Sequence, residues 1–116
     1  MQSKSILKYF IIIIILVLIS KNSISYAATE DDKDYVLTTS IMLGEAQACE
    51  INTKVKENQF SNWINKTFNS KELSYYISLA VLEQIKIAKL QREGKTIYTC
   101  IDVNRIYKQF PWPWEE

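Results

Sequence analysis

The hydrophobic and polar positions of the chain show two long stretches of helical periodicity. In the first, small and apolar residues recur at steps of three and four between positions 37 and 55. In the second, a similar stripe runs between positions 73 and 88. Such steps place residues on one face of a helix, so the pattern predicts two amphipathic helices. The first stripe comprises Leu37, Ile41, Gly44, Ala48, Ile51 and Val55, and the second comprises Leu73, Tyr76, Ile77, Ala80, Val81, Ile85 and Ala88.

Local signals set the expected ends of these helices. Acidic residues gather at positions 30–34, where negative charge favours a helix N-terminus. Asn69 followed by Glu72 resembles a capping box, and Gly94 is a typical helix stop. We therefore expect the second helix to span 70–93, and we expect the small residues Gly44 and Ala48 to let another helix approach the first one closely.

Two further segments have weaker patterns. Residues 58–69 place aromatic side chains at helical spacing among polar ones, which predicts a short helix or helical turn that covers the core. Residues 95–110 fit a helix, while 97–103 also alternate like a strand. We predict a helix, because a single strand would have no partner elsewhere in the chain. Two prolines then predict that 111–116 is an extended tail.

The first 27 residues are typical of a cleavable secretory signal peptide. Lys4 and Lys8 precede an uninterrupted apolar run at 9–19, and small residues at Ser25 and Ala27 suit cleavage after Ala27. A retained membrane anchor is the alternative. The apolar run is too short for it, because eleven helical residues reach about 16 Å and the hydrocarbon core measures about 30 Å. We expect an exported chain, periplasmic or secreted, with no membrane span after cleavage.

Charge and cysteine content narrow the range of partners and folds. The full chain carries 14 Lys and Arg against 13 Asp and Glu, and cleavage after position 27 would leave 11 against 13, a net charge of −2. Nucleic acid is therefore not an expected partner. Cys49 and Cys100 are the only cysteines, and an even number in an oxidising compartment predicts a disulfide. A disulfide that closes the loop between positions 49 and 100 would stabilise a small domain by about 4 kcal/mol.

The residues needed for common catalytic and metal sites are missing. The chain has no histidine and only two glycines, so it lacks a catalytic His base and a glycine-rich phosphate loop. We therefore predict a protein that is not an enzyme and that has neither a cofactor nor a metal site. A catalytic carboxylate pair is formally possible, but charged residues on helices this small are mostly solvated, which is the interpretation we favour. The candidates for such a pair are Glu45, Glu50, Glu72 and Glu83. Cations that step along the end of the second helix could form a basic strip for an acidic partner or lipid headgroups, but we favour ordinary helix C-terminal charge. These residues are Lys86, Lys89, Arg92 and Lys95.

Aromatic residues suggest a binding surface. Trp112 and Trp114 lie in the proline-rich tail, and together with Phe110 and Trp63 they are candidates for contact with a protein partner, although we favour a core role for the two tail rings. In that core role, both tail rings fold back onto the helices beside Trp63.

These observations predict an all-α bundle of three to four helices at 28–110, stapled by one disulfide and followed by the tail. We expect the helices that carry Cys49 and Cys100 to be tied together, with the 70–93 helix packed across both. The plan is similar to that of the small acid-stress chaperones of the bacterial periplasm, although no local motif is shared. The function expected is that of an exported, non-enzymatic binding protein, such as a periplasmic inhibitor, an immunity-type factor or a chaperone. The alternatives are a secreted effector and a structural subunit of an envelope complex.

Overall fold

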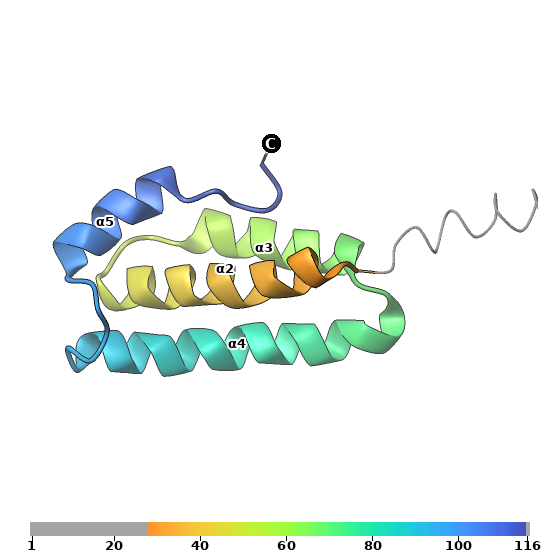
Figure 1. Ribbon diagram of the computed structural model, residues 1–116, viewed down its shortest axis with the longest axis horizontal. Helices are drawn as coiled ribbons and strands as arrows, with labels where there is room; N and C mark the ends of the chain where they lie inside the picture. The colour runs from red at the N-terminus through yellow and green to blue at the C-terminus, as the bar shows by residue number, and fades with distance from the viewer. Residues whose placement is uncertain (1–27, 116) are drawn as a thin grey trace, which may run out of the picture.

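The computed structural model describes residues 28–115, which fold into four helices with no strand in that range (Figure 1). The helices are α2 (Glu30–Ala48), α3 (Lys54–Thr67), α4 (Ser70–Arg92) and α5 (Cys100–Gln109). The predicted all-α fold is confirmed. The predicted signal peptide at 1–27 lies outside the described residues.

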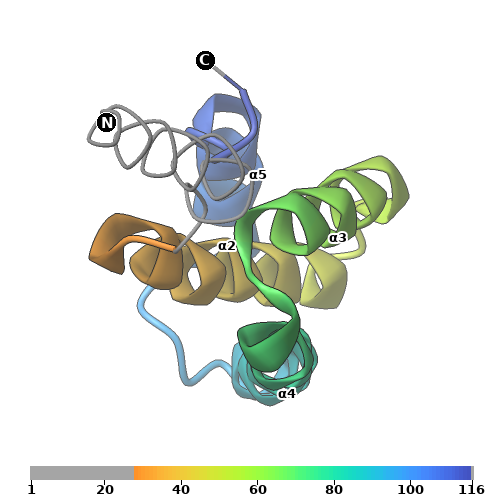
Figure 2. The same ribbon diagram turned by 90° about the vertical axis from the view of Figure 1, so that its right-hand side faces the viewer.

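Helix α2 is the central element of the bundle. In Figure 2, where α4 is seen down its axis, α2 lies between α5 and α4, with α3 beside it. All five residues from Met42 to Ala46 are buried, because neighbours cover α2 on more than one side. The predicted single stripe is therefore wrong in detail: Leu37 is 38 % exposed, whereas Val36 and Leu43 are fully buried.

Helix α2 also ends earlier than the stripe predicted. Glu50 has a φ of 63°, a left-handed conformation that ends a helix. The Glu50 amide then bonds to the Gln47 carbonyl at 3.0 Å and the Ile51 amide to that of Ala46 at 2.9 Å, which is the Schellman arrangement. Ile51 consequently lies in the loop, and Val55 belongs to α3.

Helix α3 is longer than the predicted short segment and forms a full member of the bundle. It begins at Lys54 and buries Phe60 and Ile64, and its C-cap Phe68 is also buried. These positions are four residues apart, so they lie along one side of the helix. The prediction of an aromatic face is confirmed, while the start at 58 is wrong.

Helix α4 matches its predicted limits to within one residue. The Asn69 side chain accepts hydrogen bonds from the amides of Lys71 (2.9 Å) and Glu72 (3.0 Å), and so caps the N-terminus. Gly94 has a φ of 70° and follows the last turn. Both ends are set by local hydrogen bonding, which explains why the sequence pattern located them.

Helices α2 and α4 approach each other closely at Gly44. A Cβ atom added there would lie 2.7 Å from the Gln84 carbonyl oxygen. Only glycine allows the two backbones to come this near. The predicted close approach is confirmed at this position.

The disulfide Cys49–Cys100 is present and joins the end of α2 to the start of α5, with 5.5 Å between the Cα atoms. Helix α5 packs on the side of α2 opposite α4 (Figures 1 and 2). The expectation that the long helix packs across both cysteine-bearing helices is therefore wrong. The disulfide and the buried Val103 hold α5 at the far side of α2.

The segment before α5 is neither helix nor strand. Thr99 caps α5, because its side chain accepts a hydrogen bond from the Asp102 amide. Gln91 of α4 is buried and donates to the Tyr98 carbonyl at 2.9 Å, while Thr96 donates to the Gln91 side chain. The predicted helix is confirmed from Cys100 to Gln109, and 95–99 form an ordered connection instead.

Candidate functional site

The tail folds back onto the helices. Trp112 is only 4 % exposed, and its ring lies 5.2 Å from that of Tyr107 and 4.6 Å from that of Phe110. The Lys56 ammonium sits 5.0 Å from the Trp112 ring centre and also pairs with Glu115 at 2.9 Å. The expected folding back is therefore observed for Trp112, whose ring contributes to the core, and its role in partner binding stays a prediction.

The other tail tryptophan extends the same cluster toward α3. The Trp114 ring stacks on that of Trp112 at 5.4 Å, and its Nε1 donates to the Gln59 side chain at 3.1 Å. Trp114 and Trp63 both line a shallow hollow of about 180 Å³. The structure thus gathers the predicted aromatic residues in one region. A binding role for Trp63, Phe110 and Trp114, which are half-buried, stays a prediction.

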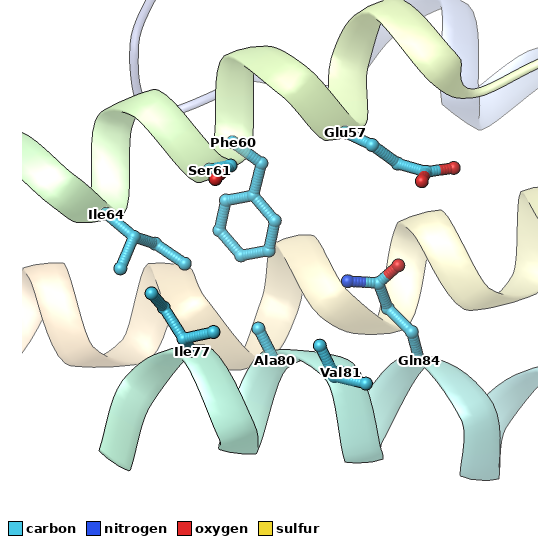
Figure 3. A pocket seen from close by; sticks show the side chains of 8 residues that line it. All are labelled: Glu57, Phe60, Ser61, Ile64, Ile77, Ala80, Val81 and Gln84. Atoms are coloured by element: carbon cyan, nitrogen blue, oxygen red, sulfur yellow. The ribbon is translucent and has the colours of Figure 1, made fainter. Parts of the chain in front are cut away.

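An apolar groove lies between α3 and α4, with a volume of about 190 Å³ (Figure 3). Phe60 and Ile64 of α3 face Ile77, Ala80 and Val81 of α4 across it. Each set recurs at steps of three or four, so each helix presents these side chains along one edge. The apolar side chains whose spacing predicted these helices therefore also line the groove.

One end of the groove is polar and tightly hydrogen-bonded. Gln47 of α2 donates through Nε2 to Glu57 at 3.2 Å and to the Gln84 side-chain oxygen at 2.9 Å. Thr53 also donates to the Glu57 carboxylate. The Gln84 amide nitrogen faces the apolar part of the groove in Figure 3 and has no hydrogen-bond partner within residues 28–115. It is therefore available to donate to a bound group.

Apolar side chains continue from the groove onto the outer side of α4. Val81 is 49 % exposed, and Leu82 and Ile85 are 63 % and 62 % exposed. Periodicity predicted that Ile77, Val81 and Ile85 would face the core, and this is wrong, because each is exposed by a third or more. The apolar stripe of α4 is wider than the surface that α2 and α3 cover, and the surplus faces solvent.

The exposed face of α4 is basic at both ends. Lys71 lies near its start, and Lys86, Lys89 and Arg92 lie near its end, all exposed. Glu83, at 4.0 Å from Lys86, and the exposed Glu93 after Arg92 offset part of this charge. The apolar strip is therefore flanked by positive charge.

Within the described part of the chain, no group of three or more His, Cys, Asp or Glu residues could hold a metal ion. The described helices also include none that is long and apolar enough to cross a bilayer.

The chain matches no protein-family model, and no curated protein or solved structure is significantly similar to it. Function must therefore be argued from the site itself. The groove offers a concave apolar surface with a hydrogen-bond donor at one end and an exposed apolar strip alongside. Surfaces of this kind bind apolar side chains presented by a partner helix.

Proposed function

We propose that the protein is an exported, non-enzymatic binding protein, such as a periplasmic inhibitor, an immunity-type factor or a chaperone, and that it acts through contacts with a protein partner. The observation that carries the proposal is the apolar surface of α4 beside the α3–α4 groove. Large apolar side chains exposed side by side mark interaction sites in soluble domains, whereas scattered ones do not.

The groove and the exposed strip suit an amphipathic helix of the partner. One apolar side chain of that helix would enter the groove, and its neighbours would cover Leu82 and Ile85. Burial of a large apolar side chain contributes about 1.5 to 3 kcal/mol, so a few such contacts carry most of the affinity. Acidic residues along the partner helix would meet the cations at the ends of α4, which favours association and orientation.

Export is supported by two features. The disulfide is typical of proteins in an oxidising compartment, which for this chain means the periplasm or the secreted fraction. The predicted signal peptide at 1–27 is the route by which the chain would reach it.

The test compares two exposed apolar positions. Leu82→Asp lies on the proposed surface, and Ile101→Asp lies on α5 at 82 % exposure. Both should fold, because neither side chain belongs to the core. Tagged proteins are expressed from the full chain in the source cells, and cross-linked partners are quantified by mass spectrometry. We expect Leu82→Asp to lose a partner that wild type and Ile101→Asp retain.

A partner retained equally by all three proteins would contradict this site. Fractionation of the same cells bears on location: protein held in the periplasm favours an inhibitor, immunity-type factor or chaperone. Protein recovered only from the medium would favour a secreted effector instead, and protein found only in a large envelope assembly would favour a structural subunit.

A further inference from the structure

A second groove lies on the other side of α2, between α2 and α5. Its volume is about 210 Å³, and apolar side chains dominate its lining: Ile41 and Met42 from α2, Ile106 from α5, and Phe110 just after it. Among these lies one carboxyl group, that of Glu45. Because α5 and α4 contact opposite sides of α2, this groove is separate from the one between α3 and α4 (Figure 2).

Glu45 is largely buried, its carboxyl oxygens reach solvent at the groove, and no charged group of residues 28–115 pairs with it. Only 8 % of the residue is exposed, and within residues 28–115 its side chain makes no hydrogen bond and no ion pair. Its burial raises the pKa of the carboxyl group above the ordinary value. Glu57, which lines the α3–α4 groove, differs from Glu45 because its carboxylate accepts hydrogen bonds from Gln47 and Thr53.

An unpaired carboxylate in apolar surroundings destabilises a folded protein. Destabilised groups are a known feature of functional sites, where activity and stability trade off. A carboxyl group of low exposure on an apolar groove wall favours a ligand that carries a cationic group on an apolar stem.

We infer that the α2–α5 groove binds an alkylammonium group, which is a positively charged amine on an apolar stem. The ammonium would pair with the Glu45 carboxylate, and the stem would contact Ile41, Met42, Ile106 and Phe110. The groove is smaller than the roughly 300 to 1,000 Å³ of sites for drug-sized ligands, so it has room for one lysine side chain or one small amine. Anions are disfavoured by Glu45, and neutral ligands leave it unpaired.

The probe is hexylammonium, with hexanol as its neutral counterpart. Protein produced from the full chain is titrated with each at neutral pH, and NMR follows the methyl groups of Ile41, Met42 and Ile106. We expect saturable shifts with hexylammonium and an affinity at least about tenfold weaker for hexanol, a difference of about 1.4 kcal/mol. Equal affinity for both probes, or no binding of hexylammonium, would overturn the inference.

The matched variants are Glu45→Gln and Glu30→Gln. Both remove one negative charge from α2, but Glu30 lies in the exposed first turn, far from the groove. Glu45→Gln should weaken hexylammonium binding about tenfold or more, while Glu30→Gln should bind like wild type. An equal effect of both variants would mean non-specific attraction and would refute the site. The hexanol comparison needs no variant, so it decides the question even if Glu45→Gln folds poorly.

A third titration separates the two sources of an alkylammonium group. An end-capped peptide with one lysine presents the same group on a chain. Shifts of the three methyl groups with this peptide would identify a protein side chain as the ligand, and shifts with hexylammonium alone would identify a free amine. Both results support the inference. These titrations require no partner on α4, so their outcome is independent of the proposed function.

Discussion

Replacement of Gly44 by alanine gives the sharpest test of the packing between α2 and α4. The added Cβ would lie 2.7 Å from the backbone oxygen of Gln84 and 3.1 Å from the Cβ of Ile87. Neither atom belongs to the mobile end of a side chain. The helices must therefore separate by about 0.7 Å to reach the 3.4 Å at which ordinary van der Waals contact begins.

Two effects of opposite sign set the magnitude. Alanine is a better helix former than glycine by about 1 kcal/mol, which would stabilise α2. Overpacking in a well-packed core costs about 1 to 3 kcal/mol. We expect the steric effect to prevail, because the obstacle is backbone, and the net loss to be about 1 kcal/mol. In a domain of this size that lowers the melting temperature by about 4 to 8 °C.

Urea unfolding followed by circular dichroism measures the difference, with Ser78→Ala on the exposed side of α4 as a control. The control should be neutral or slightly stabilising, because it changes helix propensity without adding a contact. A Gly44→Ala variant as stable as wild type would refute the close approach. The groove offers a second readout, since displacement of α4 would lengthen the hydrogen bond of 2.9 Å between Gln47 and Gln84.

Three other predictions follow from the contacts described above. Glu50→Gly should stabilise the protein by about 1 kcal/mol in urea unfolding, because glycine adopts a positive φ without strain; Glu50→Ala should give no such gain. Trp112→Ala should cost about 3 to 5 kcal/mol in the same assay, and a loss below 1 kcal/mol would contradict burial of the ring. Because burial raises the pKa of Glu45 in the folded protein, its effect on stability becomes unfavourable as pH rises from the ordinary carboxyl pKa through the raised one. Glu45→Gln should therefore melt higher than wild type near neutral pH and lose that advantage in acid, which calorimetry across this pH range measures.

The sequence by itself determined the helical class, the limits of α4 and the disulfide. Asn69 and Gly94 act within one turn of their own positions, because a cap bonds to amides two or three residues away and glycine tolerates positive φ. The cysteine pairing followed from their number and from the expected compartment. None of these features depends on where other helices lie.

The end of α2 shows the limit of such local reasoning. Glu50 adopts the left-handed conformation that glycine usually adopts at a helix end. Because glutamate is not a typical helix-ending residue, the sequence did not predict that α2 ends there. On either side of Glu50, Cys49 is bonded to Cys100 and Ile51 packs against the core. The strained residue therefore lies between two residues that make long-range contacts.

Only the tertiary structure decided which apolar residues are buried and which form surfaces. Val36 is buried and Leu37 is partly exposed, because several helices cover α2 from different sides. The periodicity of apolar residues predicts only one buried face of a helix. Val81 and Ile85 belong to the same stripe as the buried Ala80, but the width of the covered strip depends on the positions of α2 and α3. The burial of Glu45 likewise required α5 to lie against α2. The candidate sites are therefore properties of how the helices approach one another, which the spacing of residues within one helix does not contain.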